Sequence, residues 1–153
     1  IALDVDTLLI PNITLHETID RIRSKLNKKP LVIHPVELTI HKLKTEKHRQ
    51  ITLIGSKYSM NSSYLKQAFE NQNIKVEVPN EAEQKQIDQF RTLVYHSKEK
   101  KSDVRSFNNL IGKYFDSQAV VIACTELSLL LDKEYDNFDM VQIQLSETLK
   151  NRE

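Results

Sequence analysis

The chain's one cysteine, Cys124, has the sequence context of a reactive thiol. It follows the apolar run AVVIA at residues 119–123 and precedes Thr125 and Glu126. A buried strand that ends here and leads into a helix would place the thiol at a helix N-terminus, where free amides and the helix dipole favour a thiolate. We therefore expect Cys124 to be partly exposed, with a pKa below the usual ~8.5. The same amides and the Thr125 hydroxyl could hold a carboxylate. The alternative is that Cys124 is a small buried apolar residue, a common role for a free cysteine.

Two other turns carry polar groups where apolar runs end. The run VDTLLI at residues 5–10 leads into Pro11, Asn12, Ile13 and Thr14. The Thr14 hydroxyl either belongs to a binding site or only begins a helix, because Glu17 stands at the capping-box spacing from it. The segment GSKYSMN at residues 55–61 is rich in hydroxyl and amide groups. It is suited to an anionic group, and it is equally suited to a simple capped turn.

The composition excludes several classes of protein. The 153 residues carry 22 basic and 21 acidic side chains, a balance that argues against a domain built to bind nucleic acid. Apolar residues at 39% are enough for a core, and no apolar run approaches the ~18 residues of a membrane span. The two glycines, Gly55 and Gly112, lie too far apart for a glycine-rich nucleotide-binding loop.

The cysteine and histidine content also bears on cofactors and location. A single cysteine excludes an internal disulfide and a multi-cysteine zinc site. The five histidines show no HExxH pattern, so we expect no metal. An unpaired thiol fits a reducing compartment, and the opening residues have no basic segment typical of a secretory signal, so we expect a cytoplasmic protein.

Apolar periodicity predicts that strands and helices alternate. Strands are expected at residues 5–10, 31–34, 50–54, 74–78, 119–123 and 140–144. Helices are expected after residue 13, with Leu15, Ile19, Ile22 and Leu26 on one face, and then at 36–48, 62–71, from 80 to about 94, 104–115, after 124 and at 146–153. This alternation is typical of an α/β fold with mainly parallel sheets and helices on both faces. Ligands in such folds bind at the carboxyl ends of the strands, which directs attention to the four strand-to-helix turns at residues 11–14, 55–61, 79–80 and 124–126.

Several of these segments resemble the aspartate/glutamate racemase family. The stretch from ITLIGSKYSMN through EVPNEAEQKQID is similar to the family's second domain, and VVIACTELSLLL is similar to its second active-site motif, Gly-Cys-Thr-Glu-Leu. LLIPNITLHETI aligns without gaps on the first motif, Pro-Cys-Asn-Thr-Ala-His, and LVIHPVELT resembles the strand that follows it. Together these segments cover most of the chain.

The resemblance implies an enzyme without a cofactor that acts on an amino acid such as aspartate or glutamate between two pseudo-symmetric α/β lobes. One cysteine on each side of the substrate Cα removes or returns a proton. By this resemblance Cys124 is the acid/base of the second lobe. The substrate-binding residues it implies are Thr14, Ser56, Ser59, Thr125 and Glu126. Family members often form homodimers, so a homodimer is expected; neither nucleic acid nor a membrane is an expected partner.

The departures from the family pattern concern the first motif most. Asn12 stands where the family has its first cysteine, and Ile13 stands where it has a carboxylate-binding asparagine. The family's opening strand and glycine-rich turn have no counterpart here, so we expect an incomplete first lobe at residues 1–45. The second lobe is expected at 46–139, and 140–153 should return to the first lobe as a strand and a helix.

Three functions are compatible with this pattern. The first is a racemase of this family, impaired because Asn12 replaces the first catalytic cysteine. The second is a one-cysteine enzyme, as in decarboxylase-like relatives, that uses Cys124 alone. The third is a non-catalytic remnant that binds a small carboxylate or a protein.

Overall fold

A computed structural model describes residues 5–25, 30–132, 134–135 and 137–150 of the chain. Its strands are β1 (Thr7–Leu8), β2 (Leu31–Val32), β3 (Gln50–Gly55), β4 (Lys75–Glu77), β5 (Ala119–Ala123) and β6 (Phe138–Asp139). Its helices are α1 (Ile13–Ile22), the 3-10 turn η1 (Arg23–Lys25), α2 (Pro35–Thr45), α3 (Lys57–Met60), α4 (Ser63–Glu70), α5 (Glu81–Tyr95), α6 (Lys101–Phe115), α7 (Thr125–Leu130) and α8 (Met140–Lys150).

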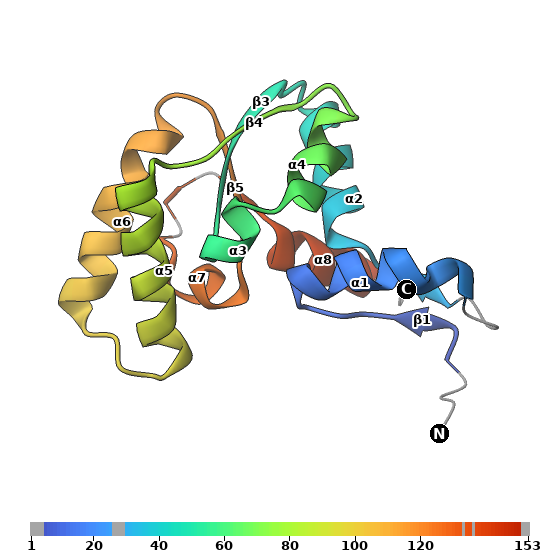
Figure 1. Cartoon of the computed structure of the whole chain (residues 1–153), viewed down its shortest axis with the longest axis horizontal. Coiled ribbons are helices and arrows are strands. Elements are labelled where there is room, and N and C mark those ends of the chain that lie inside the picture. The colour runs from blue at the N-terminus through green and yellow to red at the C-terminus, as the bar shows by residue number, and fades with distance from the viewer. Residues whose placement is uncertain (1–4, 26–29, 133, 136, 151–153) are drawn as a thin grey trace.

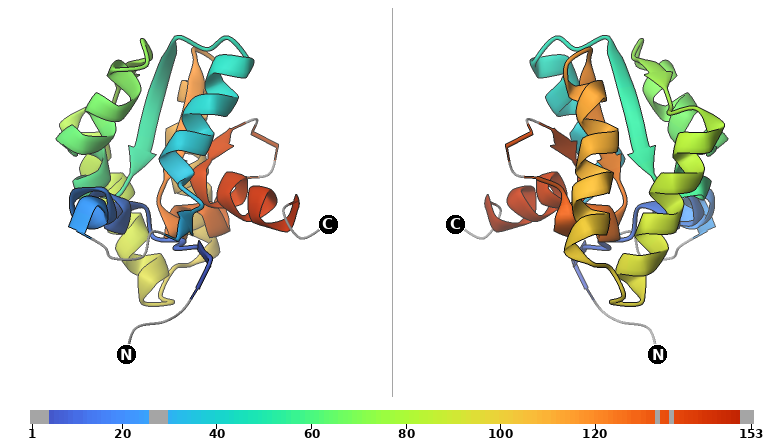
Figure 2. Two further views of the ribbon diagram at one scale, coloured as in Figure 1. Left: turned by 90° about the vertical axis from the view of Figure 1, so that its right-hand side faces the viewer. Right: turned by 90° about the vertical axis from the view of Figure 1, so that its left-hand side faces the viewer.

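The strands form two parallel sheets. One is a four-stranded sheet in the order β4-β3-β5-β6, and the other pairs β1 with β2. Helices lie on both faces of the larger sheet, and α1 with the β1 strand lies to one side of it (Figures 1 and 2). The α/β class with parallel sheets that the sequence predicts is therefore confirmed. The boundaries of the lobes expected from the sequence stay a prediction.

Two apolar cores cover the two faces of the larger sheet. Successive side chains of a strand point to opposite faces. In β5, Val121 joins a core that includes Leu43 of α2 and Phe69 of α4, and the neighbouring Val120 and Ile122 join the other. That second core contains Phe90 of α5 and Phe107 of α6, whose rings stack at 4.5 Å. Burial on both faces explains why β3 and β5 are almost continuously apolar.

The strand predicted at residues 140–144 is wrong. Residues Phe138–Asp139 form the short β6, and the helix α8 begins at Met140. The Asp139 carboxylate accepts hydrogen bonds from the backbone N–H groups of Val141 and Gln142, which caps the start of this helix. Met140, Val141 and Gln144 are buried, a spacing that suits one face of a helix.

The first predicted helix is present, but its cap and its buried face differ from the prediction. Asn12, not Thr14, is the N-cap of α1, with its side chain accepting from the backbone N–H of Leu15. The buried residues of this helix are Ile13 and His16, and Leu15 is 49% exposed. Leu26 of the predicted face lies outside the described residues. The predicted 5–10 strand is reduced to β1, because only Thr7 and Leu8 have strand partners.

Candidate active site at the ends of β3 and β5

A cavity of about 180 Å³ lies at the carboxyl ends of β3 and β5, where Gly55 and Ala123 are paired. Every site residue predicted from the sequence lines it, together with three further residues. The lining residues are Asn12, Ile13, Thr14, Ser56, Ser59, Arg91, Ala123, Cys124, Thr125 and Glu126. Segments 112 residues apart thus meet at the edge of the sheet where ligands of α/β folds bind. The volume is below the ~300–1,000 Å³ of drug-sized sites, which suits a small ligand.

Cys124 lies at the start of α7, where its thiol contacts the Glu126 carboxylate. It is the N-cap residue of this helix, as expected, and its Sγ donates to Oε2 of Glu126 at 3.3 Å. The predictions of partial exposure and of a lowered pKa are wrong. Cys124 is only 6% exposed, and its burial, reinforced by the negative charge of Glu126, raises the thiol pKa to about 12. The loss of solvation thus outweighs the backbone amides of the helix start.

Glu126 is the carboxylate that links the residues of this turn. Its Oε2 accepts from the Thr125 hydroxyl at 2.7 Å as well as from the thiol. Burial raises the Glu126 pKa as the largest single effect, but the bonds from Thr125, its own backbone amide and Cys124, with the charge of Arg91, together lower it. Glu126 is therefore ionised at neutral pH.

The turn after β3 brings two hydroxyls to the same cavity. Ser56 caps the one-turn helix α3 by accepting from the backbone N–H of Ser59 at 3.1 Å, and the two hydroxyl oxygens lie 3.0 Å apart. A Cβ on Gly55 would lie 2.9 Å from the carbonyl oxygen of Ala123 and 2.9 Å from Cβ of Ser59. Glycine at this position therefore allows the turn to approach β5 closely. The capped turn is confirmed; binding of an anion by Ser56 and Ser59 stays a prediction.

Asn12 and Thr14 form the wall contributed by α1. Oδ1 of Asn12 accepts from the Thr14 hydroxyl at 2.9 Å and from the backbone N–H of Leu15 at 3.2 Å. A carboxamide has no acidic or basic group with a pKa near neutral pH, and its oxygen already accepts two hydrogen bonds at the start of α1. Asn12 therefore has a local structural role at the start of α1.

Arg91 is the site residue that the sequence analysis missed. It lies on α5, and its Nε donates to Oδ1 of Asp88 at 2.8 Å, while its Nη1 lies 3.5 Å from Oε1 of Glu126. The spacing of Asp88 and Arg91 by three residues is a common helical ion pair and gives no sign of a site. Only the fold shows that this pair faces Glu126, 35 residues further along the chain.

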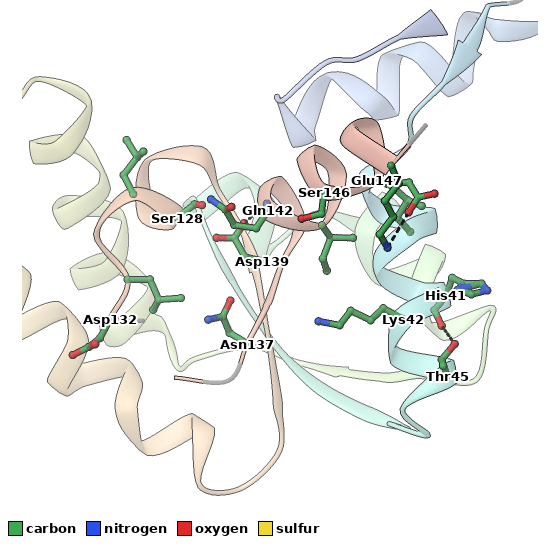
Figure 3. A pocket seen from close by; sticks show the side chains of 15 residues that line it. His41, Lys42, Thr45, Ser128, Asp132, Asn137, Asp139, Gln142, Ser146 and Glu147 are labelled. Atoms are coloured by element: carbon green, nitrogen blue, oxygen red, sulfur yellow. Dashed lines mark hydrogen bonds and ion pairs between the residues drawn. The ribbon is translucent and has the colours of Figure 1, made fainter. Parts of the chain in front are cut away.

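A larger groove of about 820 Å³ lies away from Cys124, between α2 and the α7–α8 region (Figure 3). Lys42, Asn137 and Asp139 are among its polar residues, and Lys42 also lies over the ring of Phe138 at 5.0 Å. The Asp139 carboxylate is used by the α8 backbone. The groove and the smaller cavity are both lined in part by α7, but they have no lining residue in common. Cys124 lines the smaller cavity.

Within residues 5–25, 30–132, 134–135 and 137–150, no group of three or more His, Cys, Asp or Glu side chains is arranged to hold a metal ion. In the same part of the chain, no helix has the length and apolar character needed to cross a membrane.

Comparisons with solved structures show where this fold is known. An aspartate racemase homologue from Pyrococcus horikoshii OT3 is 20% identical, with a TM-score of 0.80 over 95% of this chain and 66% of its own length. Aspartate racemase of Picrophilus torridus is 16% identical, with a TM-score of 0.76 over 97% of this chain and 62% of that one. Glutamate racemase of Campylobacter jejuni subsp. jejuni is 21% identical, with a TM-score of 0.61 over 99% and 62%.

At these identities the likeness shows the fold alone. The chain spans slightly less than two thirds of the length of these structures. No curated protein matches the sequence significantly. The sequence profile of Asp/Glu/hydantoin racemases, in contrast, matches residues 1–147, nearly the whole chain. The chain belongs to the Asp/Glu/hydantoin racemase family.

Proposed function

We propose that the Cys124 cavity binds a small carboxylate, such as aspartate or glutamate, and exchanges its Cα proton from one face only. The single observation that carries this proposal is the pairing of Cys124 with Asn12 in one cavity. Inversion at carbon needs an acid on one face and a base on the other, and an amide can serve as neither. The chain is then a racemase-family protein that is impaired in inversion.

The raised pKa of the thiol makes this exchange slow, because the thiolate must remove the Cα proton and only the return of the proton uses the thiol. A thiol whose pKa is raised to about 12 is protonated at neutral pH, as a general acid must be. This is the state that a one-cysteine enzyme of the decarboxylase-like kind would use to protonate a carbanion. The same burial also supports the second candidate function, a non-catalytic protein that binds a carboxylate, because a buried thiol is slow to react.

The binding groups proposed for the carboxylate are hydroxyls and backbone amides. Thr14, Ser56, Ser59 and Thr125 line the cavity. The hydroxyls of Thr14 and Thr125 donate to Asn12 and Glu126 in the free chain, so we propose that they turn to a bound carboxylate and that the first amides of α7 assist them. Such donors bind a carboxylate without a metal or an organic cofactor. We further propose that the protein works in the cytoplasm, where its single thiol would stay reduced, and that it forms a homodimer.

Proton exchange in deuterated buffer tests this function. We expect one enantiomer of aspartate or glutamate to gain deuterium at Cα slowly, with no appreciable inversion by chiral chromatography, and Cys124→Ser to abolish the exchange. Asn12→Cys should raise inversion, because it restores an ionisable group on the other face. Asn109→Cys, on the exposed side of α6, is the matched control for an added thiol.

Two results would decide against the proposal. Rapid inversion by the native chain would mean that another residue supplies the second acid. No exchange by either the native chain or Asn12→Cys, although calorimetry detects aspartate or glutamate binding, would favour the binding-only function.

A further inference from the structure

Arg91 is placed between the two polar turns of the cavity. Its guanidinium is fixed at one end by Asp88, whose Oδ1 also accepts from the backbone N–H of Lys57 at 3.0 Å. Lys57 begins α3 and directly follows Ser56. The other end of the guanidinium faces Glu126 on α7. The Asp88–Arg91 pair thereby joins the Ser56 turn to the Cys124 turn.

The two oxygens of Glu126 have separate partners. Oε1 faces Nη1 of Arg91, and Oε2 accepts from the Cys124 thiol and the Thr125 hydroxyl. The side chains of Arg91 and Glu126 are 23% and 21% exposed, so the pair is only partly screened by solvent. A carboxylate that is bound on one side by a guanidinium has a defined orientation towards its other partner.

We propose that Arg91 is a positioning residue for Cys124: anchored by Asp88, it holds the Glu126 carboxylate so that one oxygen remains on the thiol. The role rests on the proposed use of Cys124 as an acid or base. Without Arg91 the carboxylate beside the thiol lacks its counter-charge, and the thiolate becomes less accessible as an intermediate of proton transfer. This role requires the several N–H donors of a guanidinium, which can contact Asp88 and Glu126 together, and a positive charge alone is not enough.

The test measures the reactivity of the thiol and needs no substrate. Iodoacetamide alkylation of Cys124 is followed by mass spectrometry between pH 8 and 10, in the native chain, Arg91→Met, Glu126→Gln and the double variant. Well below its pKa the thiol reacts in proportion to its thiolate fraction, so a tenfold change in rate reports one pKa unit. Arg105→Met, on an exposed part of α6, is the matched control.

We expect Arg91→Met to slow alkylation by at least about threefold, or about half a pKa unit, and Glu126→Gln to accelerate it. The effect of Arg91→Met should be clearly smaller in the Glu126→Gln background, because a residue that acts through Glu126 loses its influence when that carboxylate is gone. Arg105→Met should react like the native chain.

Equal slowing in both backgrounds would overturn the proposal, since Arg91 would then act only as a nearby charge. No slowing in either background would overturn it as well. If Arg91→Met does not fold, Arg91→Lys replaces it: a single ammonium cannot bridge Asp88 and Glu126 as a guanidinium does, so the rate should still fall below the native value. A native rate in Arg91→Lys would contradict the positioning role. Because alkylation requires no ligand, this outcome is independent of the proton-exchange test of the proposed function.

Discussion

The side-chain amide of Gln144 donates a hydrogen bond to the carbonyl oxygen of Ile33 at 2.6 Å, across 111 residues of chain. The same nitrogen lies 3.2 Å from the carbonyl oxygen of Ile10, which also faces Nε2 of His16 at 2.9 Å. Ile10 and Ile33 follow β1 and β2, and Gln144 is fully buried on α8. One amide thus ties the last helix to the ends of both strands of the small sheet, next to the turn that carries Asn12.

Removing this amide should destabilise the chain. Gln144→Leu has a similar volume but no donor, so the Ile33 carbonyl loses a buried hydrogen bond and the Ile10 carbonyl keeps only His16, at a cost of about 1–3 kcal/mol in the free energy of unfolding. Urea denaturation followed by circular dichroism measures the difference. Gln142→Leu, on the exposed side of the same helix, should change stability by no more than about 0.5 kcal/mol. Equal stability of the native chain and Gln144→Leu would show that the bond contributes nothing net.

Substitution by alanine should affect the stability of the chain differently at its two glycines. In Gly55→Ala the new Cβ meets the Ala123 carbonyl and Cβ of Ser59, both at 2.9 Å, and neither can move freely. We expect a loss of about 1–3 kcal/mol from overpacking. In Gly112→Ala the nearest atom, at 2.7 Å, is the hydroxyl of Tyr135, whose ring stacks on Phe115 and which donates to the carbonyl oxygen of Asn108. Gly112 lies inside α6, where alanine is favoured by up to about 1 kcal/mol, and this gain offsets part of the cost of moving Tyr135, so stability should fall less than in Gly55→Ala.

Thermal melts of the two variants check this contrast. A native melting temperature for Gly55→Ala would mean that the turn after β3 can move away from β5. The cavity would then be less tightly built than the distances indicate.

The sequence was most informative where local signals and burial agree. The apolar run of β5 and the helix predicted from residue 80 are both confirmed, and an Asn80–Glu83 capping box begins that helix, α5. The prediction for residues 140–144 was wrong because MVQIQ alternates apolar and polar residues as a strand does. A helix begins there instead, because the Asp139 side chain caps its first backbone N–H groups. Sequence spacing gave no indication of Arg91 or of the burial of Cys124, because both depend on which elements pack together.

Stability should fall as the pH drops below about 6.5, because of His34. This side chain is buried and caps α2 by accepting from the backbone N–H of Glu37 at Nδ1. Burial and the neighbouring His16, with a smaller effect of Arg23, lower the His34 pKa against the opposing charges of Asp20 and Glu37. The unfolded chain therefore binds the proton first as the pH falls. The His34 contribution is complete above about 6.5, the unfolded pKa, and is lost as the pH falls towards the folded pKa.

Denaturation at half-unit steps of pH measures this dependence, which for one proton is at most about 1.4 kcal/mol per pH unit. His34→Asn keeps a side-chain acceptor for the α2 cap and removes the titration, so its slope should be smaller. His41→Gln, an exposed histidine of the same helix, should keep the native slope. An unchanged slope in His34→Asn would assign the titration to another group.

The cap formed by Asn12 affects any variant that introduces a cysteine at this position. Asn12→Ala removes the acceptor for the Leu15 backbone N–H and for the Thr14 hydroxyl, and should cost about 0.5–2 kcal/mol in the free energy of unfolding. Asn12→Ser keeps an oxygen that can cap the helix and should cost clearly less. Cysteine is a weak acceptor, so Asn12→Cys should resemble the alanine variant in stability. Chemical denaturation of the three variants gives this order, and equal stability of all three would mean that α1 does not depend on its cap. If the variants show this order of stability, Asn12→Cys has a less stable α1 than the native chain. Any gain of inversion in Asn12→Cys is then due to the added thiol and not to a more stable helix.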